Sequence, residues 1–481
     1  MPVRLPSFLS LFNHADRRQA NHAVRRFDGA AGGRRGWGMG VFGRVNPEVG
    51  AAAVSLRSRA RYLATNNPWI AQAVANWTGA LVGSGITPVA RHRDADSRTA
   101  LSEHFADWSD LADMDGRTDF FGLQADIGRG LVIDGEAFVH VVMTDDGIRL
   151  RLIPPELVDE SMTRDLGDGR MIVSGVELDA DGRRVAYHIF PGKPTDQFAT
   201  YATPIRVPAE DILHVMKPLA AGQVRGVSWL APVILPTNEF DQLLDALLVG
   251  VKIAAMHAGF LVDQNGTAGE PYDGTGIGGI MESGLEPGTL KRLPTGVDVK
   301  FSTPQQANEV AAFLRLNLQQ LAAGLGLPEH LLSGDLTGAN YSSLRAGLLP
   351  FRQRVEAIQY HVLVPQLLNP IWRRVTIYAV LSGDLDAPDF ETAPRAYGAE
   401  WLPPKPLQVD PLKDTEATVA EIDAGLTSRR KAVAERGWDV DALDAEIAAD
   451  AAREAKLDLP FKLKKESTDA AGSPGPQPSE T

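Results

Sequence analysis

The sequence predicts an α+β fold on three observations. Apolar residues recur at helical spacing through residues 236–258 and again through 303–325. Between residues 131 and 190, apolar and polar residues instead alternate, as in strands that bury one face. Asp146-Gly147 and Asp181-Gly182 interrupt this alternation where hairpin turns would fall. Helical periods and hairpins in separate stretches of one chain are typical of the α+β class.

The composition is that of an ordinary globular protein. The chain has 481 residues, of which 44% are hydrophobic and 23% charged, enough for two or three packed units. No window reaches the roughly 18 consecutive apolar residues of a membrane-spanning helix, and the N-terminus lacks an apolar stretch of secretory length. The absence of cysteine excludes disulfides, thiolate metal sites and cysteine nucleophiles. We therefore expect a chain made in the cytosol.

Residues 1–50 are predicted to form a flexible basic arm, since they are rich in Gly and Arg and show no apolar period. Residues 1–62 carry eleven arginines against three acidic residues, a net charge of +8. Because the whole chain has a net charge of −13, the remaining residues carry −21. A protein that grips nucleic acid needs clustered Lys and Arg on its folded surface. The acidic body excludes such a grip, and the arm is either an assembly contact or a solvated tail.

Residues 51–235 are predicted to form an α+β body. A helix is expected from about Arg57 to Val82, and further helix within residues 98–130. Strands are expected from the stretch LVIDGEAFVHVVM at 131–143 onward, with the two Asp-Gly hairpins joining them in pairs.

Two predicted helices flank a small insertion. The first spans residues 236–258, with acidic residues in its first turn. The insertion, residues 259–302, is rich in Gly and Pro and is predicted to be β-rich or extended. The second helix spans residues 303–325 and opens on Thr303-Pro304-Gln305-Gln306, which offers a capping box with Pro at the first helical position.

The remaining chain is predicted in four parts. Residues 326–341 form a turn-rich loop, and residues 342–382 a long helix that Pro350, Pro365 and Pro370 kink or interrupt. Residues 383–457 form a mostly helical unit, and residues 458–481 are too polar and Pro-rich to pack. We detect no internal repeats.

No motif for nucleotide chemistry emerges. The one Gly-Lys pair, Gly192-Lys193, is followed by Pro194 instead of the Ser or Thr of a phosphate-binding loop. A dinucleotide loop would need a strand before it and a helix after it, and neither flanks the glycines at 274, 276, 278 and 279. A flexible loop is the better interpretation. We therefore expect no cofactor.

Candidate catalytic groups each have a simpler structural explanation. No His pair has the spacing of a metal site, so His188 and His214 are expected to be ordinary strand residues. Ser84 lies between glycines but follows a helix, unlike a nucleophile elbow. Asp145-Asp146 and Asp134 with Glu136 are explained by hairpin turns and strand edges. We expect no catalytic residue and no bound metal.

Tyr341, Ser342, Ser343 and Arg345 crowd the predicted start of the long helix. These residues either form a binding site or are an ordinary helix start, with Ser342 or Ser343 as the cap and Arg345 in solvent. Periodicity alone favours the ordinary helix start.

Seven stretches carry a family resemblance, at residues 56–88, 175–189, 213–217, 222–234, 285–299, 321–347 and 409–417. The most specific is LAAGLGLPEHLLSGDLTGANYSSLRAG at 321–347, in which a Gly stop, a Pro, a turn loop and a Tyr-Ser-Ser-x-Arg helix start follow one another. Together the stretches resemble the lambda-type bacteriophage portal protein family over roughly residues 50–456. The segment KPLAAG at 217–222 departs from the Arg-Pro pair that this family often carries.

The resemblance implies an α+β subunit with a wing, a two-helix stem, a small clip insertion and a helical crown. Such subunits close into a ring, usually of twelve, at one vertex of the capsid. Matching segments assign residues 51–235 and 342–382 to the wing, 236–258 and 303–325 to the stem, 259–302 to the clip, 326–341 to a tunnel loop and 383–457 to the crown.

The resemblance also implies the functional residues and the partners. The tunnel loop would face double-stranded DNA with Ser333, Gly334, Asp335, Leu336, Thr337, Gly338, Ala339 and Asn340, and the helix start after it would comprise Tyr341, Ser342, Ser343 and Arg345. The ring would serve DNA packaging and ejection and would dock terminase, major capsid and scaffold proteins, and head-completion or tail proteins. It would be assembled in the host bacterial cytoplasm and kept in the virion, without a membrane.

Two other classes of protein remain open from the residues alone. One is a head-assembly enzyme, such as a maturation protease or nuclease, which the lack of a nucleophile or metal constellation disfavours. The other is a generic head-completion or scaffold protein. Monomers or open oligomers would favour that reading, because a portal subunit is expected to close into a ring.

Overall fold

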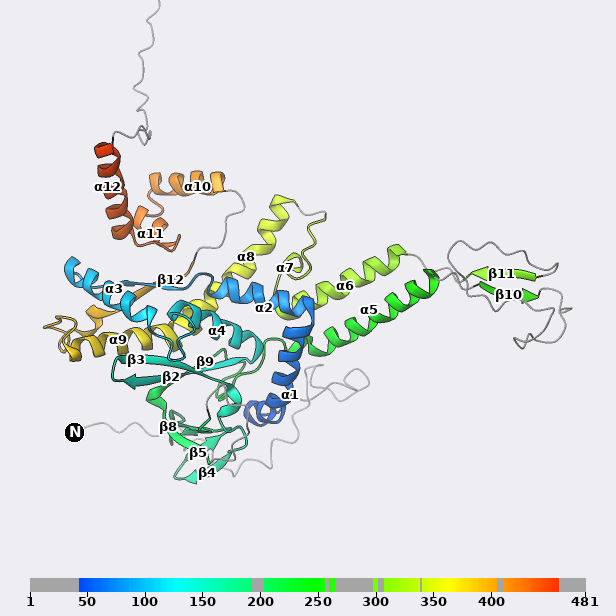
Figure 1. Ribbon diagram of the computed structural model, residues 1–481, viewed down its shortest axis with the longest axis horizontal. Coiled ribbons are helices and arrows are strands. Elements are labelled where there is room, and N and C mark those ends of the chain that lie inside the picture. The colour runs from blue at the N-terminus through cyan, green and yellow to red at the C-terminus, as the bar shows by residue number, and fades with distance from the viewer. Residues whose placement is uncertain are drawn as a thin grey trace, which may run out of the picture.

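The computed structural model describes residues 43–192, 203–255, 259–263, 297–301, 307–337, 340–404 and 411–457. The predicted α+β class is confirmed: helices and antiparallel sheets form one body. Two long helices project together from this body, and a unit of three helices lies to one side of it (Figure 1). The predicted tail at 458–481 and residues 1–42 of the predicted arm lie outside the described residues.

The N-terminal part of the body holds two helices where the sequence predicted one over 57–82. Helix α1 spans Val45–Asn66, so the predicted arm ends before residue 50, and helix α2 spans Pro68–Leu81. Two neighbouring residues explain the break between α1 and α2. Pro68 has no backbone N–H to continue α1, and the Asn67 side chain accepts a hydrogen bond from the Ile70 amide at 3.0 Å to begin α2.

A three-stranded antiparallel sheet forms the middle layer of the body, in the order β3-β2-β9. Its strands are β2 (Glu136–Thr144), β3 (Gly147–Ile153) and β9 (Ile212–Met216). The predicted hairpin at Asp146-Gly147 is confirmed, because β2 and β3 pair across it. The predicted strand at 131–143 begins too early, since residues 131–133 complete helix α4 and Gly135 turns the chain with φ of 85°.

The middle sheet is covered on both faces. Val139, Val141 and Leu150 on one face join the main apolar core, together with helices α3 (Ala95–Asp110) and α4 (Phe120–Ile133). Phe138, Ile153 and Ile212 on the other face join a second core against a five-stranded sheet. The strands of that sheet, in spatial order, are β4 (Arg164–Gly167), β5 (Arg170–Val173), β6 (Val176–Leu178), β7 (Arg184–Ile189) and β8 (Ile205–Pro208). The second predicted hairpin is confirmed by the β6–β7 pairing.

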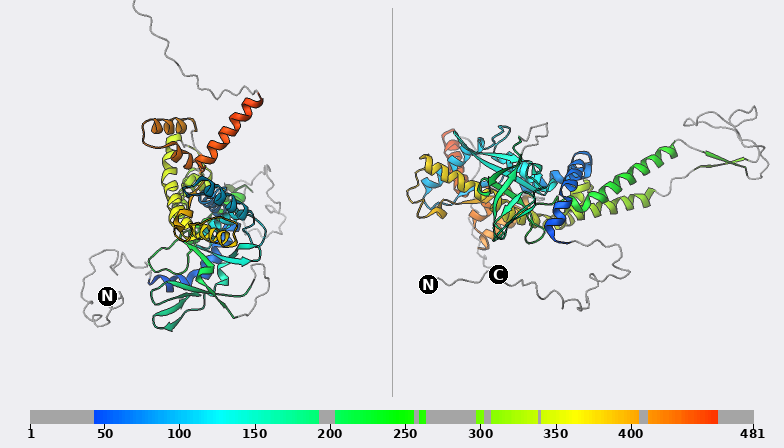
Figure 2. Two further views of the ribbon diagram at one scale, coloured as in Figure 1. Left: turned by 90° about the vertical axis from the view of Figure 1, so that its left-hand side faces the viewer. Right: turned by 90° about the horizontal axis from the view of Figure 1, so that it is seen from below.

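The two projecting helices, which we call the helix pair, are α5 (Ile234–Ala255) and α6 (Ala307–Leu325). At the far end of the helix pair lies an antiparallel strand pair, β10 (Gly259–Asp263) and β11 (Val297–Phe301) (Figures 1 and 2). The predicted capping box at 303–306 and the glycines at 274, 276, 278 and 279 lie outside the described residues.

The predicted loop at 326–341 is partly helical. Pro328 begins a short helix, α7 (Glu329–Ser333), which the buried side chain of Leu332 anchors in the main core. Gly334 ends α7 with a left-handed backbone, φ 72°. The loop therefore runs only from residue 334 to 340, and residues 338 and 339 of it lie outside the described part of the chain.

The long helix predicted for 342–382 is present without a break. It runs as α8 (Tyr341–Ile358), a π-helical segment η8 (Gln359–Leu368) and α9 (Asn369–Ser382). Pro350 lies inside α8 and Pro365 inside η8. The wider π turn relieves the clash that proline makes with the preceding turn of an α-helix, so the chain changes pitch instead of ending.

The separate unit predicted for 383–457 is shorter than expected. Strand β12 (Ala399–Leu402) pairs with β1 (Thr87–Ala90), and Trp401 lies buried in the main core. Residues 383–404 thus belong to the body, because their large apolar side chains complete its core. The unit itself holds α10 (Pro411–Asp423), α11 (Arg429–Ala434) and α12 (Val440–Leu457). Short 3-10 turns are η5 (Pro155–Leu157), η6 (Ala209–Asp211), η7 (Ala231–Val233) and η9 (Pro394–Tyr397).

Candidate functional site

One aromatic side chain of α2 contacts the base of the helix pair. Trp77 is buried, and its indole N–H donates to the carbonyl of Leu325 at 3.0 Å, which holds the C-terminal end of α6. The ring packs edge-on against Trp229, with centroids 5.2 Å apart. Gly324 allows close approach here, since a Cβ on it would lie 2.5 Å from Val233. Both helices of the pair are therefore fixed to the body at the same place.

The outer half of the helix pair is apolar but exposed. Leu243, Leu244, Leu314 and Leu318, nearer the base, pack against the main core. Beyond them several large apolar side chains are 52–60% exposed: Leu248, Val249, Val251 and Phe313. An exposed apolar surface of this kind is typical of a contact with a partner.

The loop between α7 and α8 is shaped by its own side chains. Ser333 accepts a hydrogen bond from the Asp335 amide at 3.1 Å, and Asp335 accepts one from the Thr337 amide at 2.8 Å. Asp335 also forms an ion pair with Arg315 of α6, at 3.6 Å. Its charge is thus partly balanced within the subunit. Leu336 is 57% exposed.

Helix α8 begins with a capping box that starts at Asn340, not at Ser342 or Ser343. The Asn340 side chain accepts from the Ser343 amide at 2.8 Å, and the Ser343 hydroxyl accepts from the Asn340 amide at 3.0 Å. Ser342 is exposed. Arg345 forms an ion pair with Asp414 of α10 at 3.5 Å, so it connects the first turns of two helices. Gly338, Ala339 and the side chain of Tyr341 lie outside the described residues.

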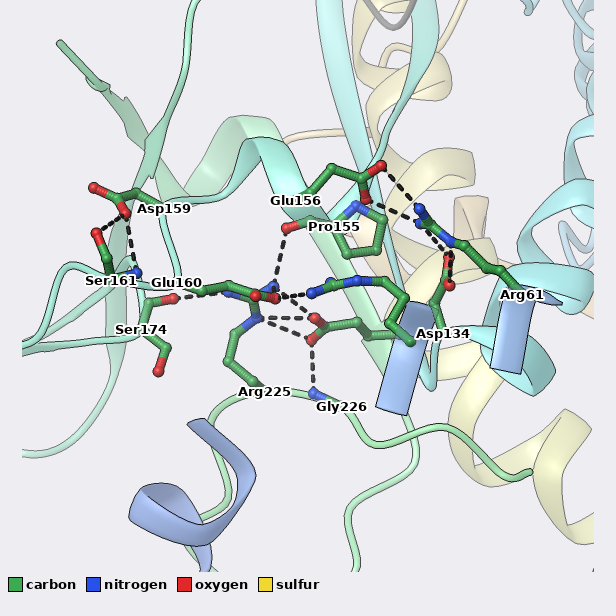
Figure 3. Close-up of polar contacts among 12 residues, drawn as sticks. Arg61, Asp134, Pro155, Glu156, Asp159, Glu160, Ser161, Ser174, Arg225 and Gly226 are labelled. Carbon is green, nitrogen blue, oxygen red and sulfur yellow. Dashed lines mark hydrogen bonds and ion pairs between the residues drawn. The ribbon is translucent and has the colours of Figure 1, made fainter. Parts of the chain in front are cut away.

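A buried ion pair lies where the body meets the segment that leads into α5 (Figure 3). The guanidinium of Arg225 donates to Glu136 through Nη2 at 2.7 Å and through Nε at 2.9 Å. It also donates to the carbonyls of Ser174 at 2.8 Å and Pro155 at 3.1 Å. Both charged side chains are at most 4% exposed. One arginine therefore joins β2, the β5–β6 turn and η5.

The Glu136 carboxylate is held from two further sides. It accepts the Gly226 amide at 2.6 Å and lies 2.9 Å from Nε2 of His214 on β9. Burial by itself would raise the pKa of Glu136, but the Arg225 charge and the His214 bond outweigh burial and hold the pKa well below its ordinary value. Burial also lowers the pKa of His214 to about 4. His214 is therefore neutral at neutral pH and donates through Nε2, leaving its buried Nδ1 without a partner.

A series of ion pairs connects Arg225 and Glu136 to helix α1. Glu160 accepts hydrogen bonds from both Arg225 and Arg57 of α1. A second arginine of α1, Arg61, bonds Asp134 at 2.8 Å and Glu156 at 2.9 Å (Figure 3). Asp134 follows the end of α4 and Glu136 is the first residue of β2, so these two lie at a strand edge, and both side chains form structural ion pairs. We call Arg225, Glu136, His214, Glu160 and Arg57 the buried charge cluster.

Two glycines let the chain approach this cluster closely. Gly135 has φ of 85°, and a Cβ on it would lie 2.0 Å from the carbonyl carbon of Val227. A Cβ on Gly226 would lie 2.4 Å from the carbonyl oxygen of Gly135. The backbone leading into α5 therefore lies directly against the start of β2, with no room for a side chain.

The other candidates from the sequence have structural roles or none. His188 on β7 lies 3.2 Å from Glu177, and Ser84 lies in the turn after α2. Within the described ranges, no cluster of three His, Cys, Asp or Glu side chains could hold a metal ion. A search of the same residues finds no helix long and apolar enough to cross a membrane.

Comparison with known families identifies the chain. The family model described as "Phage portal protein, lambda family" matches residues 34–359. The chain belongs to the lambda family of phage portal proteins. The family and the portal function predicted from the sequence are thereby confirmed.

Curated relatives carry the same name. The chain is 27% identical over 433 residues to the probable portal protein of Halomonas phage phiHAP-1, covering 84% of this chain and 82% of the relative. It is 25% identical to the portal protein of Escherichia phage N15 and to portal protein B of Escherichia phage lambda, each over 87% of this chain and 88% of the relative. These relatives are named as portal proteins, not as proteases or nucleases.

Solved structures resemble the chain more distantly. The neck of an empty gene transfer agent particle matches with a TM-score of 0.48 and 18% identity, over 84% of this chain and 96% of the other. An HK97 family phage portal protein from Corynebacterium diphtheriae matches with a TM-score of 0.31 and 11% identity, over 72% of this chain and 95% of the other.

The buried charge cluster is the feature that sequence reasoning missed. The sequence alone suggests only catalytic, strand-edge or ordinary strand roles for Glu136 and His214, and no buried role for Arg225. A signal existed: Glu136 and Arg225 each adjoin a glycine, in Asp134-Gly135-Glu136 and Arg225-Gly226. Glycine permits a close approach of the backbone, and a charged residue in an apolar stretch needs a partner once it is buried.

Proposed function

We propose that this chain forms a closed homo-oligomeric ring, of about twelve copies, at one vertex of a phage capsid, and that double-stranded DNA passes through its channel during packaging and ejection. The supporting observation is the exposed apolar outer half of the helix pair. A single subunit leaves Leu248, Val251 and Phe313 in water, whereas a neighbouring copy would cover them.

In this proposal the helix pair is the stem, and the strand pair β10–β11 at its far end belongs to the clip. The clip would dock terminase during packaging and head-completion or tail proteins afterwards. The loop at 334–340 would line the channel, and α10–α12 would form the crown. Capsid and scaffold proteins would meet the body, and the ring would act without catalysis of its own, assembled in the host cytoplasm and retained in the virion.

The state of assembly tests this function. Replacing two exposed stem side chains with charges, Leu248→Glu together with Phe313→Glu, would place carboxylates in the subunit contact. We expect the purified variant to run as monomers or small open oligomers in size-exclusion chromatography with light scattering, while the parent runs as a ring. The control is Leu381→Glu, because Leu381 is 82% exposed at the end of α9, away from the helix pair (Figure 1). Unchanged rings in the double variant would contradict the proposed contact.

A further inference from the structure

The buried charge cluster lies where the middle sheet, the five-stranded sheet and the segment leading into the stem meet. Arg225 bonds the start of β2 through Glu136, the five-stranded sheet through Ser174 and η5 through Pro155. The next residue, Gly226, donates its amide to the same carboxylate. Only seven residues, 227–233, separate Gly226 from the first residue of α5.

The segment after Gly226 is packed against the body along its path to the stem. The Trp229 amide donates to the Val132 carbonyl at 3.1 Å, and Trp229 packs against Trp77, which holds the end of α6. Leu230 and Val233 are buried in the main core. From Arg225 to the stem the described chain therefore has no free hinge, so a shift of the cluster would be passed on to the base of α5.

A closed ring places a strict requirement on that direction. Where neighbours in the proposed ring touch through both the stem and the body, the same rotation must satisfy both contacts. Twelve copies require about 30° per subunit, and eleven or thirteen differ from this by only about 2–3°. A small change in the angle between stem and body thus changes the number of subunits that closes the ring.

We propose that Arg225 is a positioning residue that sets the angle between stem and body and thereby the subunit number of the ring. Its buried fork of donors suits the task, since arginine bonds several acceptors in a fixed plane. Lysine could keep the charge beside Glu136 but could not also reach Ser174 and Pro155. The inference rests on the proposed ring and adds a residue that controls its size.

The test measures ring masses by native mass spectrometry. The main variant is the double replacement Arg225→Met with Glu136→Gln, which removes both buried charges and leaves an amide oxygen for Gly226. We expect it to fold and to form rings of at least two sizes, separated by one subunit of 51.8 kDa, where the parent forms one. The matched control is Arg206→Met with Glu177→Gln, because that pair, at 2.8 Å, joins strands within the five-stranded sheet only.

Two outcomes would overturn the inference, and both differ from failure of the proposed function. A double variant with the single ring mass of the parent shows that Arg225 does not set the angle. A spread of ring sizes in the control as well shows that any loss of an ion pair has this effect. If circular dichroism shows the double variant unfolded, Arg225→Lys decides by the same criterion. A parent chain that forms no ring instead contradicts the proposed function itself.

Discussion

Arg225 and Glu136, 89 residues apart in the chain, form a buried ion pair with hydrogen bonds of 2.7, 2.9 and 3.2 Å. Removing only the arginine would leave a buried carboxylate without its counter-charge. We expect Arg225→Met to lose about 3–5 kcal/mol of unfolding free energy. The double replacement with Glu136→Gln should lose less than half of that. Urea denaturation at one fixed subunit concentration measures both, and a double variant less stable than the single one would contradict the pairing.

Gly135 and Gly182 provide a matched pair of substitutions. Both have left-handed backbones, with φ of 85° and 79°, but a Cβ would meet the Val227 backbone at Gly135 and open space at Gly182. We expect Gly182→Ala to cost about 1–2 kcal/mol from backbone strain alone. Gly135→Ala should cost several kcal/mol more, because the segment leading into the stem must move. Equal melting temperatures for the two variants would refute the close approach.

His214 should make the subunit sensitive to acid. Its pKa is lowered to about 4 in the fold, whereas an unfolded histidine titrates near 6.5, so the unfolded chain takes up the proton first. The stability that neutral His214 contributes is therefore lost as pH falls from about 6.5 to 4, by up to about 3 kcal/mol. His214→Gln, which keeps a donor for Glu136, should flatten this part of the stability curve. Both proteins are compared at pH 8 as the reference, and parallel curves below pH 6.5 would exclude the effect.

The parts of the fold that the sequence predicts are those that depend on residues close together in the chain. The hairpins at Asp146-Gly147 and Asp181-Gly182 follow from turn residues that need no distant partner. The break at Asn67-Pro68 was equally local and was missed, because the apolar spacing continues across it. Strand β12, by contrast, is defined by pairing with β1, more than 300 residues earlier, and no local pattern reports such a contact.

At the candidate site, too, the local turns can be predicted from the sequence, whereas the contacts between distant elements cannot. The glycines and turn residues predict a turn-rich loop within 326–341, and the bonds of Ser333 and Asp335 form turns in part of it. The ion pairs of Asp335 with Arg315 and of Arg345 with Asp414 depend on how helices pack, so the residues alone leave both charges apparently in solvent. The buried charge cluster draws its members from α1, β2, β9 and two loops, at residues 160 and 225, which lie far apart in the chain, so no spacing argument could find it.

The loop charge should affect the passage of DNA if it lines the channel. Asp335→Lys would replace the partner of Arg315 with a second cation, and the copies around a ring would attract phosphate. We expect slower packaging at low salt and recovery as ionic strength rises, because salt screens exposed charges. Asp384→Lys, just after α9 and away from the helix pair, is the control (Figure 1). A packaging rate equal to the parent at every salt concentration would place the loop outside the DNA path.

The most direct test of the central claim is an electron micrograph of the purified chain, with its mass measured on the same sample. We predict closed rings with a central hole and a mass of roughly twelve times 51.8 kDa. Monomers, or open filaments without a hole, at concentrations where the chain is folded would contradict the account.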